Sequence, residues 1–129
     1  MKVQAIDLGI CSVEQLLYAG NVKFNTTGVD EGVTLCKMPE KAIVTRAVAV
    51  VKTAFNAGTT NVLTVGTNSD INNVLGTSDI TEGTAGTYSV DKFLEVAKGA
   101  AIKAKFTQTG TDATAGEADI YLFAAGIPD

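Results

Sequence analysis

The chain has 129 residues and a net charge of −4, with 46% hydrophobic and only 19% charged residues, and a chain of this length forms one domain with its own core. Its ten Lys and Arg residues are scattered, which argues against direct binding of nucleic acid, and no apolar run approaches the length of a membrane span. Histidine is absent, which removes His-based catalytic triads and nearly excludes zinc.

Residues 1–32 are predicted to form an N-terminal arm or edge segment. The stretch KVQAIDL at 2–8 alternates weakly, which favours a strand or an extended arm. Ser12 is followed three residues later by Gln15, and this capping-box pattern predicts one or two helical turns that end near Gly20. An apolar strand over the same residues is the alternative.

A long apolar stretch over residues 42–55 is predicted to be a central strand. Residues 33–38 form a strand before it, and Pro39 ends that strand because proline has no N–H to donate to a ladder. Ala and β-branched residues fill both faces of 42–55, which favours a strand that lies centrally in a sheet or against a partner subunit. A turn at 56–60 then predicts a return strand over 61–67 that pairs with the long strand.

Residues 68–89 are predicted to form a long polar connection. Loops of this length usually carry function, so we expect it to contact a partner. Its first residues, 68–73, space side-chain oxygens as a calcium loop does, but no Glu follows at the required offset and we predict no metal site. Four apolar residues are expected to anchor the connection: Ile71, Val74, Leu75 and Ile80.

The last third of the chain shows the clearest strand alternation. Residues 90–97 predict a strand, with one helical turn closed by Gly99 as the alternative. Apolar residues alternate with lysines in 101–108 and with acidic residues in 116–125. The Gly- and Thr-rich segment between these two stretches predicts a hairpin.

The two strands of this hairpin are predicted to pair antiparallel, with Ala104 opposite Ala118. Tyr121 and Phe123 then lie on the outer face, which indicates a covered surface at that end of the strand. The same register sets opposite charges across the two strands, as cross-strand pairs require: Lys105 with Glu117 and Lys103 with Asp119.

We assign no catalytic, cofactor-binding or metal-binding residues, and we do not expect an enzyme. The 13 glycines form no phosphate-binding motif. Cys11 and Cys36 are expected to be small buried hydrophobic residues, with a disulfide as the alternative if their strands are neighbours. Three carboxylate pairs are expected to be solvated or to follow from strand register: Asp30/Glu31, Asp79/Glu82 and Glu117/Asp119.

Two stretches resemble tailed-phage virion structural proteins of the head-decoration or head-fibre kind. They are TLCKMPEKAIVTRAVAVVKTAFNAGTTNVLTVGT at 34–67 and TGTDATAGEADIYLFA at 109–124. The resemblance implies a mainly β fold: an antiparallel β-sandwich or jelly-roll-like single domain with at most one or two short helical turns. The sandwich is expected over residues 33–129, preceded by the arm or edge segment at 1–32.

The same resemblance implies a capsid decoration or stabilising protein that assembles symmetrically on the virion. Its expected partners are copies of itself, most simply in a homotrimer, and the major capsid protein or other virion proteins. Such a protein is made in the host cytoplasm and needs no cofactor. The alternative is a head or tail fibre module that binds a receptor or carbohydrate through residues 68–89, which ranks lower because aromatic residues make up only 6% of the chain.

Overall fold

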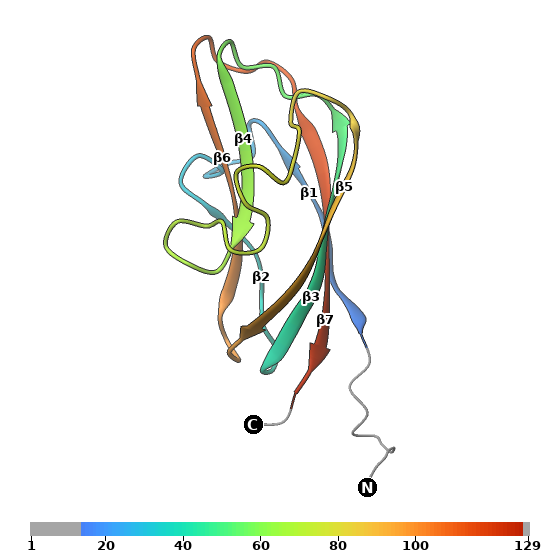
Figure 1. Cartoon of the computed structure of the whole chain (residues 1–129). Helices are drawn as coiled ribbons and strands as arrows, with labels where there is room; N and C mark the ends of the chain where they lie inside the picture. The colour runs from blue at the N-terminus through green and yellow to red at the C-terminus, as the bar shows by residue number, and fades with distance from the viewer. Residues whose placement is uncertain (1–13, 128–129) are drawn as a thin grey trace, which may run out of the picture.

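The computed structural model describes residues 14–127, which form an antiparallel β-sandwich (Figure 1). This confirms the predicted fold class. The described residues contain no helix. The sequence allowed either helical turns or a strand between Ser12 and Gly20, and the described part of this segment is a strand from Gln15 onward. The strands are β1 (Gln15–Lys23), β2 (Val33–Lys37), β3 (Ala42–Thr53), β4 (Thr60–Gly66), β5 (Gly86–Val96), β6 (Ala101–Thr109) and β7 (Glu117–Gly126).

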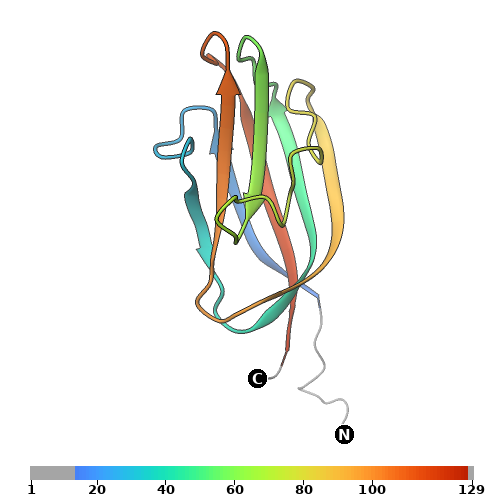
Figure 2. The ribbon, with the colours of Figure 1, turned by 60° about the vertical axis from the view of Figure 1, so that its left-hand side comes forward.

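Two sheets pack face to face, as the turned view shows (Figure 2). The four-stranded sheet has the order β1-β7-β3-β5, and the three-stranded sheet has the order β2-β6-β4. β3 lies between β7 and β5, so the long apolar stretch is central, as its two apolar faces predict. β1 comes from the segment expected as an arm or edge, and it forms the edge strand beside β7.

The predicted pairing of 42–55 with 61–67 is wrong. β3 and β4 lie in opposite sheets, and β4 pairs with β6 instead. The segment between β3 and β4 is not a tight turn, because Phe55 and Ala57 are buried as the chain crosses from one sheet to the other. An apolar alternation shows which residues face the core, but it does not show which strand lies alongside.

The predicted C-terminal hairpin is also wrong. β6 pairs with β2 and β4, whereas β7 pairs with β1 and β3. The apolar faces of β6 and β7 therefore oppose each other across the core rather than lying side by side. Lys103 and Lys105 face outward on the three-stranded sheet, and the carboxylates of Glu117 and Asp119 lie 4.0 and 3.8 Å from Lys52 Nζ on the other sheet.

Two of the six crossings between the sheets, from β3 to β4 and from β6 to β7, are bonded to each other. Asn56 lies in the first crossing, and its Oδ1 accepts hydrogen bonds from the backbone N–H groups of Thr114 and Ala115 in the second, at 2.8 and 3.0 Å. The N–H of Gly58 donates to the carbonyl of Thr111 at 2.7 Å. The crossings thus close one end of the sandwich as a single hydrogen-bonded unit.

Below this unit, the rings of Phe55 and Phe106 pack with centroids 4.9 Å apart. Gly116 lies against the ring of Phe55, with φ of +148°, and a Cβ at this position would come within 2.3 Å of the ring. The core continues between the sheets with small residues on β3 and larger ones on the opposite sheet, as sandwich cores interdigitate. Its fully buried members include Val44, Ala47, Ala49, Leu63, Val65, Ile102, Ile120 and Leu122.

The connection between β4 and β5 closes the free edge of β4. Val65 and Leu75 form a bridge, in which the N–H of Val65 donates to Leu75 O at 3.0 Å and the N–H of Leu75 donates back at 2.9 Å. The N–H of Thr67 donates to Asn73 Oδ1 at 2.7 Å. The four predicted apolar anchors of this connection are all buried. An edge that is covered in this way cannot template pairing with another chain.

Glu82 fastens the same connection to β4 and to the segment that crosses from β3 to β4. Its backbone carbonyl accepts from the N–H of Phe55 at 2.9 Å, and its carboxylate accepts from the N–H of Leu63 at 2.8 Å. The residue is only 7% exposed, so the expectation of a solvated carboxylate is wrong here. Burial raises the pKa of Glu82, and the hydrogen bond from Leu63 offsets part of that rise.

Replacement of Gly116 by Ala should destabilise the fold by about 2–4 kcal/mol, because the added Cβ meets the Phe55 ring in a backbone conformation that L-residues rarely adopt. Gly83→Ala is the matched control, since nothing lies within 4 Å of its added Cβ. Urea denaturation of the two variants and the wild type measures the difference. Equal midpoints for all three would contradict the packing described for Phe55.

Replacement of Glu82 by Gln should remove a pH dependence of stability. Because the folded-state pKa of Glu82 is raised, its contribution to stability is fully present below the ordinary Glu pKa and is lost as pH rises through the folded-state value. A Gln side chain can still accept from Leu63 and does not titrate. The free energy of unfolding of the Gln variant should therefore gain on the wild type as pH rises from about 4 to about 8.

Chemical denaturation across that pH range provides the measurement. Glu82→Ala is the control for the hydrogen bond, since it leaves the buried N–H of Leu63 without its acceptor and should cost about 1–3 kcal/mol. Parallel pH profiles for the wild type and the Gln variant would show that ionisation of Glu82 does not destabilise the fold.

Candidate functional site

The polar residues singled out from the sequence do not gather into a chemical site. Within residues 14–127, no group of three or more His, Cys, Asp or Glu side chains is placed to hold a metal ion. Asp79 Oδ2 accepts from the N–H of Gly76 at 2.7 Å and is not paired with Glu82, whose carboxylate faces Leu63. The side-chain oxygens of Asn68, Asn72 and Asn73 each accept a hydrogen bond from an N–H group within residues 67–72.

Of the two cysteines, the structure describes only Cys36. Cys36 is half-buried on β2 with a free thiol, whose pKa burial raises, and Cys11 lies outside the described residues. No helix among residues 14–127 has the length and apolarity of a membrane span. The remaining candidates for a functional site are the outer faces of the two sheets.

The outer face of the three-stranded sheet is polar and basic. Lys103, Lys105 and Thr107 point outward from its central strand β6, because the residues that alternate with them are buried. Thr34 lies opposite Lys103 on the neighbouring strand β2. This is the pattern of an ordinary solvated sheet face.

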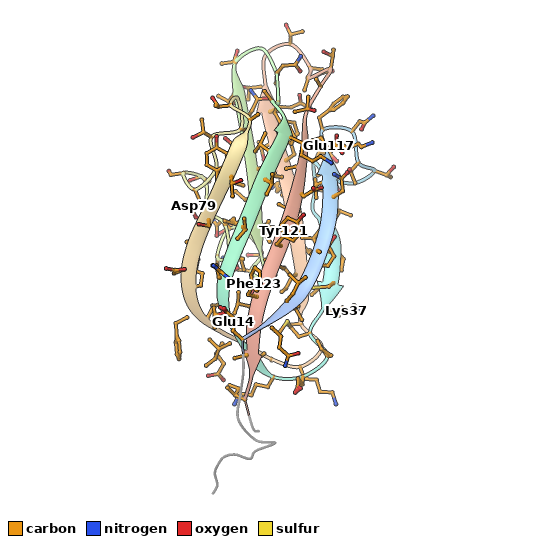
Figure 3. All side chains as sticks on the ribbon, turned by 90° about the vertical axis from the view of Figure 1, so that its right-hand side faces the viewer. Glu14, Lys37, Asp79, Glu117, Tyr121 and Phe123 are labelled. Atoms are coloured by element: carbon orange, nitrogen blue, oxygen red, sulfur yellow. The ribbon has the colours of Figure 1, made fainter. Side chains whose placement is uncertain are left out.

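The outer face of the four-stranded sheet is different, because its centre is apolar. Val48 and Val50 point outward from β3, and Tyr121 and Phe123 point outward from β7, where Figure 3 shows them along the strand. Tyr121 lies directly opposite Val48 in the register. The sequence predicted a covered surface at Tyr121 and Phe123, and the pairing of β7 with β3 extends it across two strands.

Charged and amide side chains frame this apolar centre at the end nearest the crossings. Asn21 on β1 donates through Nδ2 to Glu117 at 2.9 Å and to Asp119 at 2.8 Å. Lys52 on β3 approaches the same two carboxylates from the other side, at 4.0 and 3.8 Å. Neither Asn21 nor Lys52 was found from the sequence, because strands that neighbour each other in the sheet are distant along the chain.

A second polar group lies at the opposite end of the apolar centre, at a β-bulge in β3. Thr45 is the extra residue there, and its hydroxyl donates to the carboxylate of Glu14. The guanidinium of Arg46 lies 4.5 Å from the Phe123 ring centroid, and Arg46 Nη2 lies 3.8 Å from Glu14 Oε1. Arg46 Nε is buried without a hydrogen-bond partner among the described residues.

An apolar centre with a polar rim is the usual anatomy of a protein–protein interface. The two most exposed large hydrophobic side chains of the described range lie on the two edges of this same sheet: Leu16 on β1 is 53% exposed and Phe93 on β5 is 82% exposed. The sequence left open whether Phe93 or Leu94 faces inward, and Leu94 is the one packed against the core. The four-stranded sheet is therefore the candidate interaction surface.

No family model matches the sequence, and no curated protein matches it significantly. The fold does match solved structures. A chain in the capsid asymmetric unit of cyanophage Pam1 superposes with a TM-score of 0.70 at 19% identity, over 99% of this chain and 94% of the other. A chain in the acid-stable capsid of the Helicobacter pylori bacteriophage KHP30 gives a TM-score of 0.55 at 15% identity, over 88% of each chain. At these identities the similarity is one of fold, and this chain shares that fold with a chain from each of two bacteriophage capsids.

Proposed function

We propose that this chain is a structural protein of a bacteriophage virion, and specifically a small protein that decorates and stabilises the capsid. The observation that carries the proposal is the fold similarity to chains from two different phage capsids, each over most of both chains. Because the alignment with the Pam1 chain spans 99% of one chain and 94% of the other, the two chains are of similar length. The similarity thus covers almost the whole of the matched Pam1 chain.

The mechanism we propose is burial of apolar surface between this protein and other virion proteins. Val48, Val50 and Tyr121 present an apolar surface that a neighbouring protein can cover, while the basic face of the other sheet stays in solvent. A single small interface is weak, but many copies on one particle add their contributions. We propose that the protein acts in this way as a symmetric oligomer, with a trimer the simplest form, and that it catalyses no reaction.

Phage heads that lack this protein should bind it to a fixed copy number per head. Purified protein is added to such heads, and bound protein is measured after gradient sedimentation. Saturated heads should release their DNA at a higher temperature than bare heads, because each bound copy must be removed before the shell opens. Protein that stays at the top of the gradient at every concentration would refute the decoration proposal.

Val48→Asp tests whether the apolar outer face makes this contact. A charge that must lose its water in the interface should weaken binding to heads by about tenfold or more. Thr107→Asp, on the exposed outer face of β6, is the matched control and should bind as the wild type does. Circular dichroism shows whether both variants keep the fold. Equal loss of binding in both variants would place the contact elsewhere.

A further inference from the structure

We propose that copies of this chain join head to tail through opposite edges of the four-stranded sheet, with Leu16 on the β1 edge of one copy against Phe93 on the β5 edge of the next. This inference deepens the proposed function, because it rests on the symmetric assembly proposed above and names the contact that builds it. It concerns the contact between copies and not the contact with the shell.

Both exposed side chains lie where the strand register is interrupted. The pairing of β1 with β7 shifts between Leu16 and Tyr18. The pairing of β3 with β5 shifts where Val44 and Arg46 face Leu94 and Asp91, so that Phe93 lies within the irregular part. A bulge interrupts the hydrogen-bonded ladder and changes the direction of nearby side chains. Near the irregular positions of these two edges, the exposed large hydrophobic residues are Leu16 and Phe93.

The two exposed side chains lie within two residues of the same level of the sheet. Leu16 is opposite Phe123, Phe123 is opposite Arg46, and Arg46 is opposite Asp91, two residues before Phe93. A rotation about an axis parallel to the strands preserves this level. It therefore brings the β1 edge of one copy to the height of Phe93 on the next.

The strand directions suit the same contact. β1 is antiparallel to β7, β7 to β3, and β3 to β5, so the two edge strands run in opposite directions. A head-to-tail neighbour therefore sets β5 antiparallel to β1, which continues the alternation of the sheet. Because both edges carry bulges, β1 of one copy and β5 of the next cannot form a continuous hydrogen-bonded ladder. The two copies then approach closely only through side chains near Leu16 and Phe93.

Toward the end of the sheet that carries Asn21, the residues that would face each other are uncharged. Ala19 and Ser89 lie at the two ends of one row across the sheet, through Tyr121 and Val48. Asn21 and Thr87 lie at the ends of the next row. No like charges meet in these rows, so nothing there opposes approach of the edges.

A second copy accounts for both exposed side chains at once. Leu16 and Phe93 lie on opposite edges of the sheet, so the β1 edge of one copy can meet the β5 edge of the next. A heterologous contact uses both, because each copy offers its β1 edge to one neighbour and its β5 edge to another. Such contacts repeat until the ring closes.

Sedimentation velocity over a range of concentrations tests the contact with Leu16→Asp and Phe93→Asp. Each variant alone should need about tenfold or more higher concentration than the wild type to assemble, because each edge is spoiled in every copy. An equimolar mixture should form a two-copy complex, since the intact Phe93 edge of the first variant meets the intact Leu16 edge of the second. Phe93→Leu should assemble like the wild type, and so should Ser78→Asp, which adds the same charge in an exposed loop.

The contact is overturned if the wild type stays monomeric at all concentrations, if either Asp variant assembles as the wild type does, or if the mixture remains monomeric. The last result would mean that an intact Phe93 edge does not meet an intact Leu16 edge. Circular dichroism confirms that each variant is folded. Binding to heads lacking the protein separates this inference from the proposed function: a monomer that binds heads refutes only the contact, and a ring that ignores heads refutes only the capsid role.

Discussion

The packing of Phe55 against Gly116 and Phe106 is the constraint on which the rest of the sandwich depends. It lies where the chain crosses between the sheets twice, from β3 to β4 and from β6 to β7. Asn56 bonds the two crossings together. This cluster therefore joins the end of β3 to the start of β7, which are neighbours in one sheet, and the start of β4 to the end of β6, which are neighbours in the other.

That sorting of strands also creates the asymmetry between the two outer faces. β3 and β7 both carry apolar residues outward, and placing them side by side joins Val48 and Tyr121 into one surface. β6 carries its lysines outward on the other sheet. The three-stranded sheet therefore presents lysines along its centre, whereas the four-stranded sheet presents an apolar centre with its charged residues toward the two ends.

The connection between β4 and β5 shows how edges are managed differently in the two sheets. At β4 the connection bonds to Val65 and Thr67, and the buried carboxylate of Glu82 holds it to Leu63, so that edge is occupied within the subunit. β1 and β5 instead carry bulges and exposed hydrophobic side chains. The β4 edge is therefore occupied by the chain itself, whereas the β1 and β5 edges of the four-stranded sheet leave Leu16 and Phe93 exposed.

The sequence by itself determined that residues 42–55 are a central strand and that Ile71, Val74, Leu75 and Ile80 anchor the long connection. These conclusions follow from the local apolar pattern of the chain, whereas the antiparallel sandwich was implied by the resemblance of residues 34–67 and 109–124 to phage virion proteins. The alternation of Lys103 and Lys105 with apolar residues likewise predicted which face of β6 is exposed.

Strand pairing, the burial of Glu82, and the partners of Glu117 and Asp119 were decided only by the tertiary structure. The charged alternation of β6 and β7 fits a hairpin as well as it fits two strands that face each other across a core, because both arrangements bury the same residues. What separates them is where the crossing segments pack, and that depends on Phe55, Asn56 and Gly116 meeting from distant parts of the chain. No local pattern encodes such a meeting, since its energy comes from contacts that exist only once both sheets have formed.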